Sequence, residues 1–216
     1  DSRIHPALYQ LNLRNGRIKA LTDPAQYASN VEVKEDGSFT ADCSVSGAET
    51  VKISNGGYDL YGLMCKPEGF DPGRKYPVIV KVYGGPGTMR VRDVKGSRDA
   101  TNQWCRENGI ITIVVDPRSS GENGRAGMDC AFKRLTVTEL DDYIAWAKYL
   151  QELPYVDSSR IAVEGFSFGG TVTSMLVLRY PQYFCCGIAG GGVYDWKLYD
   201  SHYTERFMDT PQANPG

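Results

Sequence analysis

Two short, almost continuous apolar runs limit what this chain can fold into. They are residues 77–83 (Pro-Val-Ile-Val-Lys-Val-Tyr) and 110–115 (Ile-Ile-Thr-Ile-Val-Val). Such runs are typical of strands that are covered on both faces, as in a parallel sheet. Helical patterns lie between and after them, at residues 100–108 and from Val137 to Pro154. Strands that alternate with helices after about residue 75 predict a parallel, doubly wound α/β layer.

The first 65 residues instead have the pattern of antiparallel strands. Three hairpins are predicted, from residues 7–13 with 18–21, residues 31–33 with 39–41, and residues 50–53 with 58–65. The first is joined by Asn15-Gly16, which accepts the positive φ angles of a two-residue type I′ turn. The chain therefore changes from antiparallel strands to an α/β pattern.

The charge and hydropathy patterns argue against nucleic acid and a lipid bilayer as the main partners of this chain. The chain has 24 Lys and Arg against 26 Asp and Glu, a net charge of −2, so clustered basic charge for nucleic acid is missing. No apolar run approaches the roughly 18–20 residues that cross a bilayer. Residues 1–13 also lack the basic and apolar regions of a signal peptide.

The cysteines and histidines give little support to a metal site, and we expect no metal and no cofactor. The six cysteines form no Cys-x-x-Cys pair, and only two histidines, His5 and His202, are present. Cysteines inside apolar runs, such as Cys185 and Cys186, are expected to be buried free thiols. Disulfides, and with them the redox compartment, stay open.

The most informative motif is Gly165-Phe166-Ser167-Phe168-Gly169-Gly170, which lies between a predicted strand at 160–164 and a predicted helix from Gly169 to Arg179. A serine at a sharp strand-to-helix turn has strained backbone angles, and glycines beside it avoid Cβ clashes. Its hydroxyl projects at a helix N-terminus, where the N–H of Phe168 can face a developing oxyanion. This context predicts that Ser167 is a nucleophile rather than part of an ordinary turn.

Two further stretches have a structural and a functional interpretation. The first stretch, Tyr83-Gly84-Gly85-Pro86-Gly87, directly follows the first buried strand. In an α/β-hydrolase a second oxyanion donor comes from this location, but the stretch also fits an ordinary Gly/Pro turn in which Tyr83 is a packing residue. The four residues Val193, Trp196, Tyr199 and Tyr203 recur at spacings of 3, 3 and 4, one face of a helix. On spacing alone, such a stripe is more often part of a core than of a pocket.

These blocks, with residues 196–208 (Trp-Lys-Leu-Tyr-Asp-Ser-His-Tyr-Thr-Glu-Arg-Phe-Met), resemble the prolyl oligopeptidase family and specifically its dipeptidyl peptidase IV branch. The likeness runs over nearly the whole chain in the family's order. It implies an α/β fold: residues 1–50 as terminal β-propeller strands, and residues 51–216 as the N-terminal, incomplete part of an α/β-hydrolase catalytic domain.

The resemblance also implies the chemistry. It indicates a serine exopeptidase that releases N-terminal dipeptides with proline, or alanine, in second place. Ser167 would be the nucleophile, and the Phe168 N–H and the Tyr83 hydroxyl the oxyanion hole. The pocket for the proline ring would be lined by Val193, Trp196, Tyr199 and Tyr203, since aromatic walls suit a flat apolar ring. Peptides are the expected partners; the resemblance favours export to the periplasm or cell surface and allows a homodimer of the full-length protein.

The chain departs from the family pattern in several places. Phe166 and Phe168 stand where the branch usually has Trp and Tyr, and Glu164 stands where a large apolar residue is common. A hydrolase triad runs Ser, acid, His along the chain, and nothing after Ser167 fills both later roles, because His202 belongs to the aromatic block. We therefore expect the 216-residue span alone to be inactive. An acylaminoacyl peptidase or esterase, and a catalytically silent binding homologue, are the alternatives.

Overall fold

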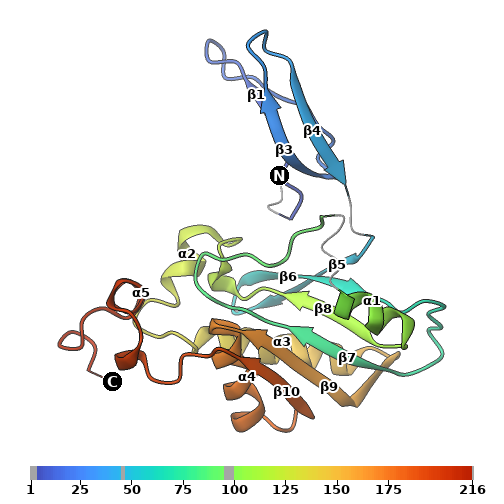
Figure 1. Cartoon of the computed structure of the whole chain (residues 1–216), viewed down its shortest axis with the longest axis vertical. Helices are drawn as coiled ribbons and strands as arrows, with labels where there is room; N and C mark the ends of the chain where they lie inside the picture. The colour runs from blue at the N-terminus through green and yellow to red at the C-terminus, as the bar shows by residue number, and fades with distance from the viewer. Residues whose placement is uncertain (1–3, 45–46, 95–99, 216) are drawn as a thin grey trace.

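A six-stranded mixed sheet organises most of the chain, and two separate hairpins precede it (Figure 1). The computed structural model describes residues 4–44, 47–94 and 100–215. The strands are β1 (Tyr9–Leu11), β2 (Ile18–Ala20), β3 (Tyr27–Val33), β4 (Phe39–Ser44), β5 (Glu49–Asn55), β6 (Tyr58–Cys65), β7 (Tyr76–Lys81), β8 (Ile111–Val115), β9 (Val156–Phe166) and β10 (Cys186–Gly190). The helices are α1 (Ala100–Glu107), α2 (Gly124–Asp129), α3 (Thr138–Glu152), α4 (Phe168–Arg179) and α5 (Ser201–Met208), with 3₁₀ turns η1 (Arg118–Ser120) and η2 (Trp196–Leu198).

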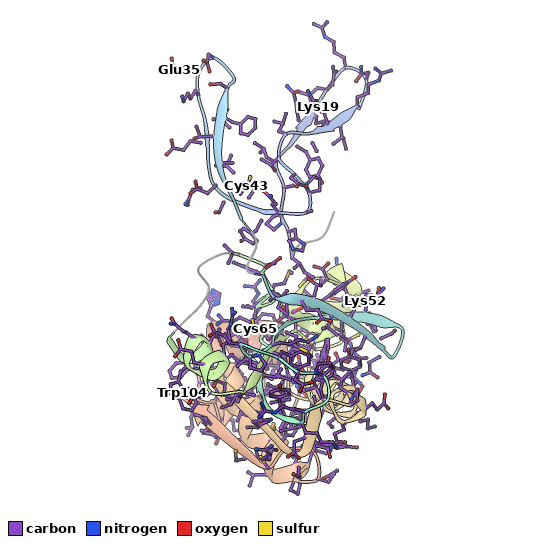
Figure 2. The ribbon with its side chains drawn as sticks, turned by 90° about the vertical axis from the view of Figure 1, so that its right-hand side faces the viewer. Lys19, Glu35, Cys43, Lys52, Cys65 and Trp104 are labelled. Carbon is purple, nitrogen blue, oxygen red and sulfur yellow. The ribbon has the colours of Figure 1, made fainter. Side chains whose placement is uncertain are left out.

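The two N-terminal hairpins are confirmed, but the first turn is not the predicted one. β1 pairs with β2 and β3 with β4, both antiparallel, and Figure 2 shows Lys19 and Glu35 on these hairpins, far from Trp104 on α1. The prediction of a two-residue type I′ turn at Asn15-Gly16 is wrong, because of these two residues only Gly16 has a positive φ, 69°. The Asn12 carboxamide accepts the N–H of Arg14 and so begins the turn several residues earlier.

The strand order of the main sheet is β10-β9-β7-β8-β6-β5. β10, β9, β7 and β8 are parallel to one another, as the apolar runs predict. The third predicted hairpin forms as β5 and β6, and β6 joins the same sheet antiparallel to β8. The fold class is thus confirmed: antiparallel strands precede an α/β sheet, which is mixed rather than wholly parallel. The division into domains at residue 50 falls inside β5 and stays a prediction.

The core lies between the sheet and helices α3 and α4. Along β7, Val78 and Val80 are buried while Ile79 and Lys81, on the opposite face, are only partly so. α3 contributes the fully buried Trp146. The apolar runs were expected to be covered on both faces, and this is confirmed only for the face that packs on α3 and α4. In the described residues, α1 covers only part of the opposite face (Figure 1).

A buried ion pair fixes the turn after β8 to helix α3. The Arg118 guanidinium binds the Asp142 carboxylate through Nε at 2.9 Å and Nη2 at 2.5 Å, and the Arg118 backbone N–H donates to the same carboxylate at 2.8 Å. Asp142 is fully buried, and Asn55 of β5 also donates to it at 2.8 Å. One carboxylate thus ties together β5, η1 and α3, and a desolvated charge in this position needs its partner.

None of the six cysteines, all of which the structure describes, forms a disulfide, and most of them are not buried. Only Cys105, on α1, is buried; Cys43 on β4 and Cys185 and Cys186 at β10 are exposed. The expectation of buried thiols is therefore wrong for these three, because β4 belongs to a two-stranded sheet and β10 is the outermost, mostly exposed strand of its sheet. No helix within the described residues has both the length and the apolar character needed to span a membrane.

The Arg118 network makes a prediction for two neighbouring aspartates. Asp142→Ala leaves Arg118 buried without its main partner, so we expect the free energy of unfolding to fall by about 3–5 kcal/mol. Asp141 also contacts Arg118, at 2.9 Å, but its side chain is 65% exposed, and Asp141→Ala should cost at most about 1 kcal/mol. Urea unfolding of both variants checks this difference, and equal losses would contradict it.

Candidate active site

Ser167 lies at the turn between β9 and α4, with backbone angles that few residues other than glycine adopt. Its φ is 59° and its ψ is −125°. Its N–H donates to the carbonyl of Gly190 at 2.8 Å, so the turn is attached to the end of β10. The structure therefore places a half-buried serine at the carboxyl edge of the parallel strands, on a strained turn of the kind that presents a nucleophile.

Two glycines of the motif are required by direct contact between backbones. A Cβ on Gly165 would collide with the carbonyl of Gly169, and a Cβ on Gly169 would lie 2.5 Å from the carbonyl oxygen of Val82. The same Cβ on Gly169 would lie 3.1 Å from the Cα of Tyr83. The turn thus packs against the end of β7 without side chains between them, which brings Tyr83 beside the Ser167 turn.

The candidate oxyanion donors lie on either side of this contact. Phe168 is the first residue of α4, so its backbone N–H has no acceptor within the helix, and the helix dipole favours negative charge there. The Phe168 ring is buried and its centroid lies 6.3 Å from that of Tyr83. The geometry brings these two residues together, and their oxyanion roles stay predictions.

A buried carboxylate to which the sequence alone assigns no role, that of Asp116, supports the segment after Tyr83. Asp116 accepts the backbone N–H groups of Arg90 and Val91, each at 2.8 Å. Burial raises the pKa of Asp116 to about 6, although these two hydrogen bonds act in the opposite direction. The guanidinium of Arg90 then lies 5.8 Å from the centre of the Tyr83 ring. One signal in the sequence is that Asp116 is a polar residue directly after an apolar strand.

The aromatic residues meet beside Phe168, but they do not lie on one helix. Trp196 begins the 3₁₀ turn η2, Tyr203 lies in α5, and Tyr199 and Val193 lie in neither. The predicted helical stripe is wrong because two aspartates begin two separate turns: Asp195 accepts the N–H of Lys197 and Asp200 that of Tyr203. Side-chain caps of this kind start a new helical turn and interrupt a continuous helix.

The rings nevertheless form one cluster through tertiary packing. Trp196 stacks on Tyr203 with ring centroids 6.3 Å apart and planes at 8°, and it lies 5.9 Å from Phe168. Tyr199 meets Trp196 edge-on at 6.2 Å. Burial raises the pKa of Tyr203 well above its usual value, and the neighbouring Tyr83 acts in the same direction. Tyr203 is therefore a neutral phenol at physiological pH, which suits a pocket for an apolar ring.

Val193 is held at the same place by its backbone. The Thr171 hydroxyl of α4 donates to the Val193 carbonyl at 2.9 Å and accepts its N–H at 2.8 Å. Because Thr171 lies one turn after Ser167, Val193 is fixed near the start of α4. The structure thus places Val193 and Trp196 against the first turn of α4, and Tyr199 and Tyr203 join them through their ring contacts with Trp196. The contacts of all four residues with substrate stay a prediction.

Neither of the two histidines, both of which lie in the described part of the chain, is hydrogen-bonded to Ser167. His5 pairs with Asp93 at 2.8 Å, and His202 lies exposed on α5. Among the residues that the structure describes, no three His, Cys, Asp or Glu side chains are grouped to hold a metal ion.

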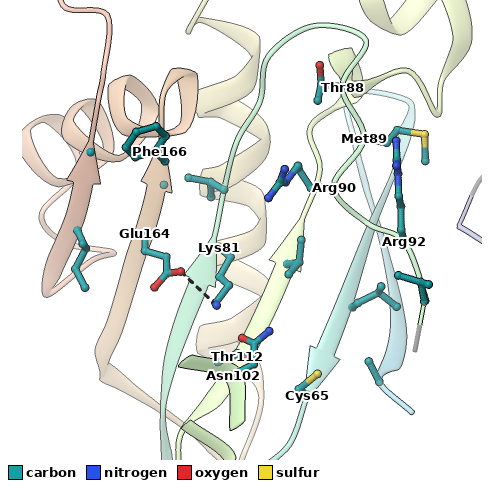
Figure 3. Close-up of a pocket in the computed structure, with 18 of the residues that line it drawn as sticks. Cys65, Lys81, Thr88, Met89, Arg90, Arg92, Asn102, Thr112, Glu164 and Phe166 are labelled. Carbon is teal, nitrogen blue, oxygen red and sulfur yellow. Dashed lines mark ion pairs between the residues drawn. The ribbon is translucent and has the colours of Figure 1, made fainter. Parts of the chain in front are cut away.

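A separate cavity of about 670 Å³ lies against α1, on the face of the sheet opposite to α3 and α4 (Figure 3). Its wall includes the ion pair between Lys81 and Glu164, at 3.3 Å, and Phe166, which is 71% exposed. Glu164, unusual in the sequence, is thus explained by its pairing with Lys81. Ser167 and the aromatic cluster do not line this cavity.

Comparisons with known proteins agree with this geometry. The family described as "Prolyl oligopeptidase family" matches residues 97–215. The chain is 43% identical over 153 residues to a protein of Grosmannia clavigera, and 40% identical over 164 residues to one of Emericella nidulans, each named "Probable dipeptidyl-aminopeptidase B". These matches cover 70% and 76% of this chain but only 16% and 18% of the relatives, so the chain spans under a fifth of their length.

Solved structures match over nearly the whole chain. Dipeptidyl peptidase 4 of Porphyromonas gingivalis matches with a TM-score of 0.82 and 30% identity, covering 99% of this chain and 35% of that one. A Bacteroides ovatus protein whose structure is named for dipeptidyl aminopeptidase IV matches with a TM-score of 0.84 and 32% identity, covering 96% and 35%. The hairpins and the mixed sheet therefore occur in the same arrangement in proteins of this branch.

The contact between the Ser167 turn and β7 predicts the effect of one methyl group. An alanine within a helix normally stabilises it by about 1 kcal/mol relative to glycine. We expect Gly169→Ala to destabilise the protein instead, by about 1–3 kcal/mol, because its Cβ would overlap the Val82 carbonyl. Thermal unfolding measures the change, with Gly73→Ala as a control at which only the Asp71 side chain is near. A Gly169→Ala protein as stable as the parent would refute the close packing.

Proposed function

Because the chain belongs to the prolyl oligopeptidase family, we propose that it carries the nucleophile and the specificity pocket of a serine exopeptidase that releases N-terminal dipeptides. The observation that carries the proposal is Ser167 on its strained turn, with the aromatic cluster packed on the next residue, Phe168. The names of the relatives and of the matched structures support the same reaction class.

In the proposed reaction the Ser167 hydroxyl attacks the carbonyl carbon of the second residue of a peptide. A general base takes the hydroxyl proton, the carbonyl oxygen becomes an oxyanion, and the amine of the third residue leaves after protonation. The Phe168 N–H and the Tyr83 hydroxyl are proposed to stabilise the oxyanion. Water then hydrolyses the ester on Ser167 and frees the dipeptide.

The base and its acid partner are proposed to come from outside residues 1–216. His5 is hydrogen-bonded to Asp93 and His202 is exposed on α5, and neither is proposed as the base that acts on Ser167. A serine without an adjacent base is a poor nucleophile, and we expect the isolated 216-residue span to be inactive.

The substrate class follows from the shape and polarity of the cluster. Trp196, Tyr199 and Tyr203 offer flat apolar ring surfaces, and these suit the ring of a proline in second place. Alanine is small enough to enter the same space. Export to the periplasm or cell surface, and a homodimer of the full-length protein, are further parts of this proposal.

The nucleophile assignment is tested in the full-length protein. We expect Ser167→Ala to lower kcat for an Xaa-Pro anilide by several orders of magnitude, about 10³–10⁶, without unfolding the protein. Ser174→Ala is a matched control, since Ser174 lies on the same helix and contacts Tyr194 instead. Labelling by a fluorophosphonate should disappear in Ser167→Ala alone; turnover that persists in this variant would exclude the assignment.

The pocket assignment makes a separate prediction about selectivity. We expect Tyr199→Ala to reduce the preference for Xaa-Pro over Xaa-Gly substrates by about 1–3 kcal/mol, because one wall of an apolar pocket is lost. Tyr194→Ala is the control, since Tyr194 is exposed and contacts Ser174 outside the cluster. The measurement is kcat/KM for both substrates, and an equal loss for both would show that Tyr199 only supports the fold.

A further inference from the structure

Helix α5 carries Tyr203 into the aromatic cluster but has little of its own to hold it in place. It has eight residues, none of them fully buried. A helix this short is marginal in water, so its position depends on tertiary contacts: the packing of Tyr203, Phe207 and Met208 against the core, and the contacts at its two ends. At its N-terminus Asp200 accepts the N–H of Tyr203 at 2.8 Å.

The C-terminus of α5 is held by one residue of the segment between α2 and α3. The Lys133 N–H donates to the carbonyl of Phe207 at 2.7 Å, and its ammonium group binds the Asp209 carboxylate at 2.7 Å. The Asn214 carboxamide donates to the carbonyls of Lys133 at 3.2 Å and of Met208 at 2.9 Å. Lys133, Asp209 and Asn214 together form what we call the α5 clamp.

The backbone at this point is strained, which shows that the surroundings determine it. Lys133 has a φ of 61° and Asp209 a φ of 66°, and left-handed angles are unfavourable for residues with a Cβ. The hydrogen bond with Lys133 also lowers the pKa of Asp209, so the pair is charged at physiological pH. A lysine ammonium at a helix C-terminus is favourable toward the helix dipole as well.

The clamp is connected to the pocket through consecutive ring contacts. Phe207, whose carbonyl accepts from Lys133, has its ring 4.8 Å from that of Tyr203. Tyr203 stacks on Trp196, and its hydroxyl lies 3.3 Å from where a Cβ of Gly85 would be, next to the segment that follows Tyr83. A shift of α5 therefore moves a pocket wall relative to Ser167.

We propose that Lys133 is a positioning residue that sets, through α5, the width of the pocket for the second substrate residue and so the preference for proline over alanine. This inference rests on the proposed function. Lys133 contacts no substrate in this scheme; it fixes the end of the helix whose aromatic residues do.

One substitution separates positioning from stability. In Lys133→Gly the ammonium group is lost but the left-handed backbone is relieved, so thermal stability should change little. The selectivity should nevertheless fall: we expect kcat/KM for Xaa-Pro to drop about two- to fivefold more than kcat/KM for Xaa-Ala, mainly through an increase in KM. A factor of this size corresponds to the contribution of a partly exposed ion pair. Lys133→Met should lose selectivity to the same extent as Lys133→Gly, and Lys133→Arg should retain the selectivity of the parent.

The experiment uses the full-length protein and a matched ion pair elsewhere. Lys52 of β5 binds Asp59 of β6 at 3.1 Å, at the end of the sheet opposite β10. Lys52→Met therefore removes a comparable ion pair outside the aromatic cluster and should leave selectivity unchanged. Hydrogen exchange of a peptide covering residues 201–208, read by mass spectrometry, should be faster in Lys133→Gly and Lys133→Met and unchanged in Lys133→Arg and Lys52→Met.

The outcomes distinguish the two proposals. An unchanged proline-to-alanine ratio in Lys133→Gly, or an equal change in Lys52→Met, would overturn the positioning role while leaving the peptidase intact. If the parent protein hydrolyses neither substrate, the proposed function fails, and the exchange of α5 then decides about the clamp: faster exchange in Lys133→Gly supports it, and unchanged exchange overturns it.

Discussion

The contact between two backbones, that of the Ser167 turn and that of the end of β7, is the constraint on which the rest of the site depends. Gly169 leaves no room for a Cβ between α4 and the Val82 carbonyl, so the start of α4 is placed against β7. That placement puts Phe168 beside Tyr83 and directs the helix N-terminus to the carboxyl edge of the sheet, where open α/β sheets bind their ligands. Shape, rather than any strong pairwise attraction, fixes the geometry.

Charged groups act around this contact as anchors for loops. Asp142 holds the turn after β8 through Arg118, Asp116 holds the segment of Arg90 behind Tyr83, and Lys133 holds the end of α5. Each acts on irregular backbone that has no sheet or long helix to support it. Because these groups differ in burial, removing them should cost different amounts of stability. A buried charge that loses its partner has no water to replace it, whereas an exposed charge is solvated again.

Much of the fold could be predicted from residue patterns because these patterns report local preferences. The apolar runs of β7 and β8, the period of α3 and the glycines of the Ser167 turn all specify their own elements. Two of the errors arose where a side chain competes locally with the expected structure. Asn12 begins the first hairpin turn early, and Asp195 and Asp200 divide the expected helix of the aromatic block into two turns.

By itself, the sequence determined the strand-to-helix turn with its serine and the set of aromatic residues, since both depend on residue type and spacing over a few positions. Only the tertiary structure decided that the rings of η2 and α5 meet at Phe168, and that Asp116 and Lys133 support the site from segments distant in the chain. The physical reason is range: steric limits on φ and ψ act between neighbours, whereas a cluster of rings or a buried carboxylate gains its energy from partners that the chain brings together only by folding.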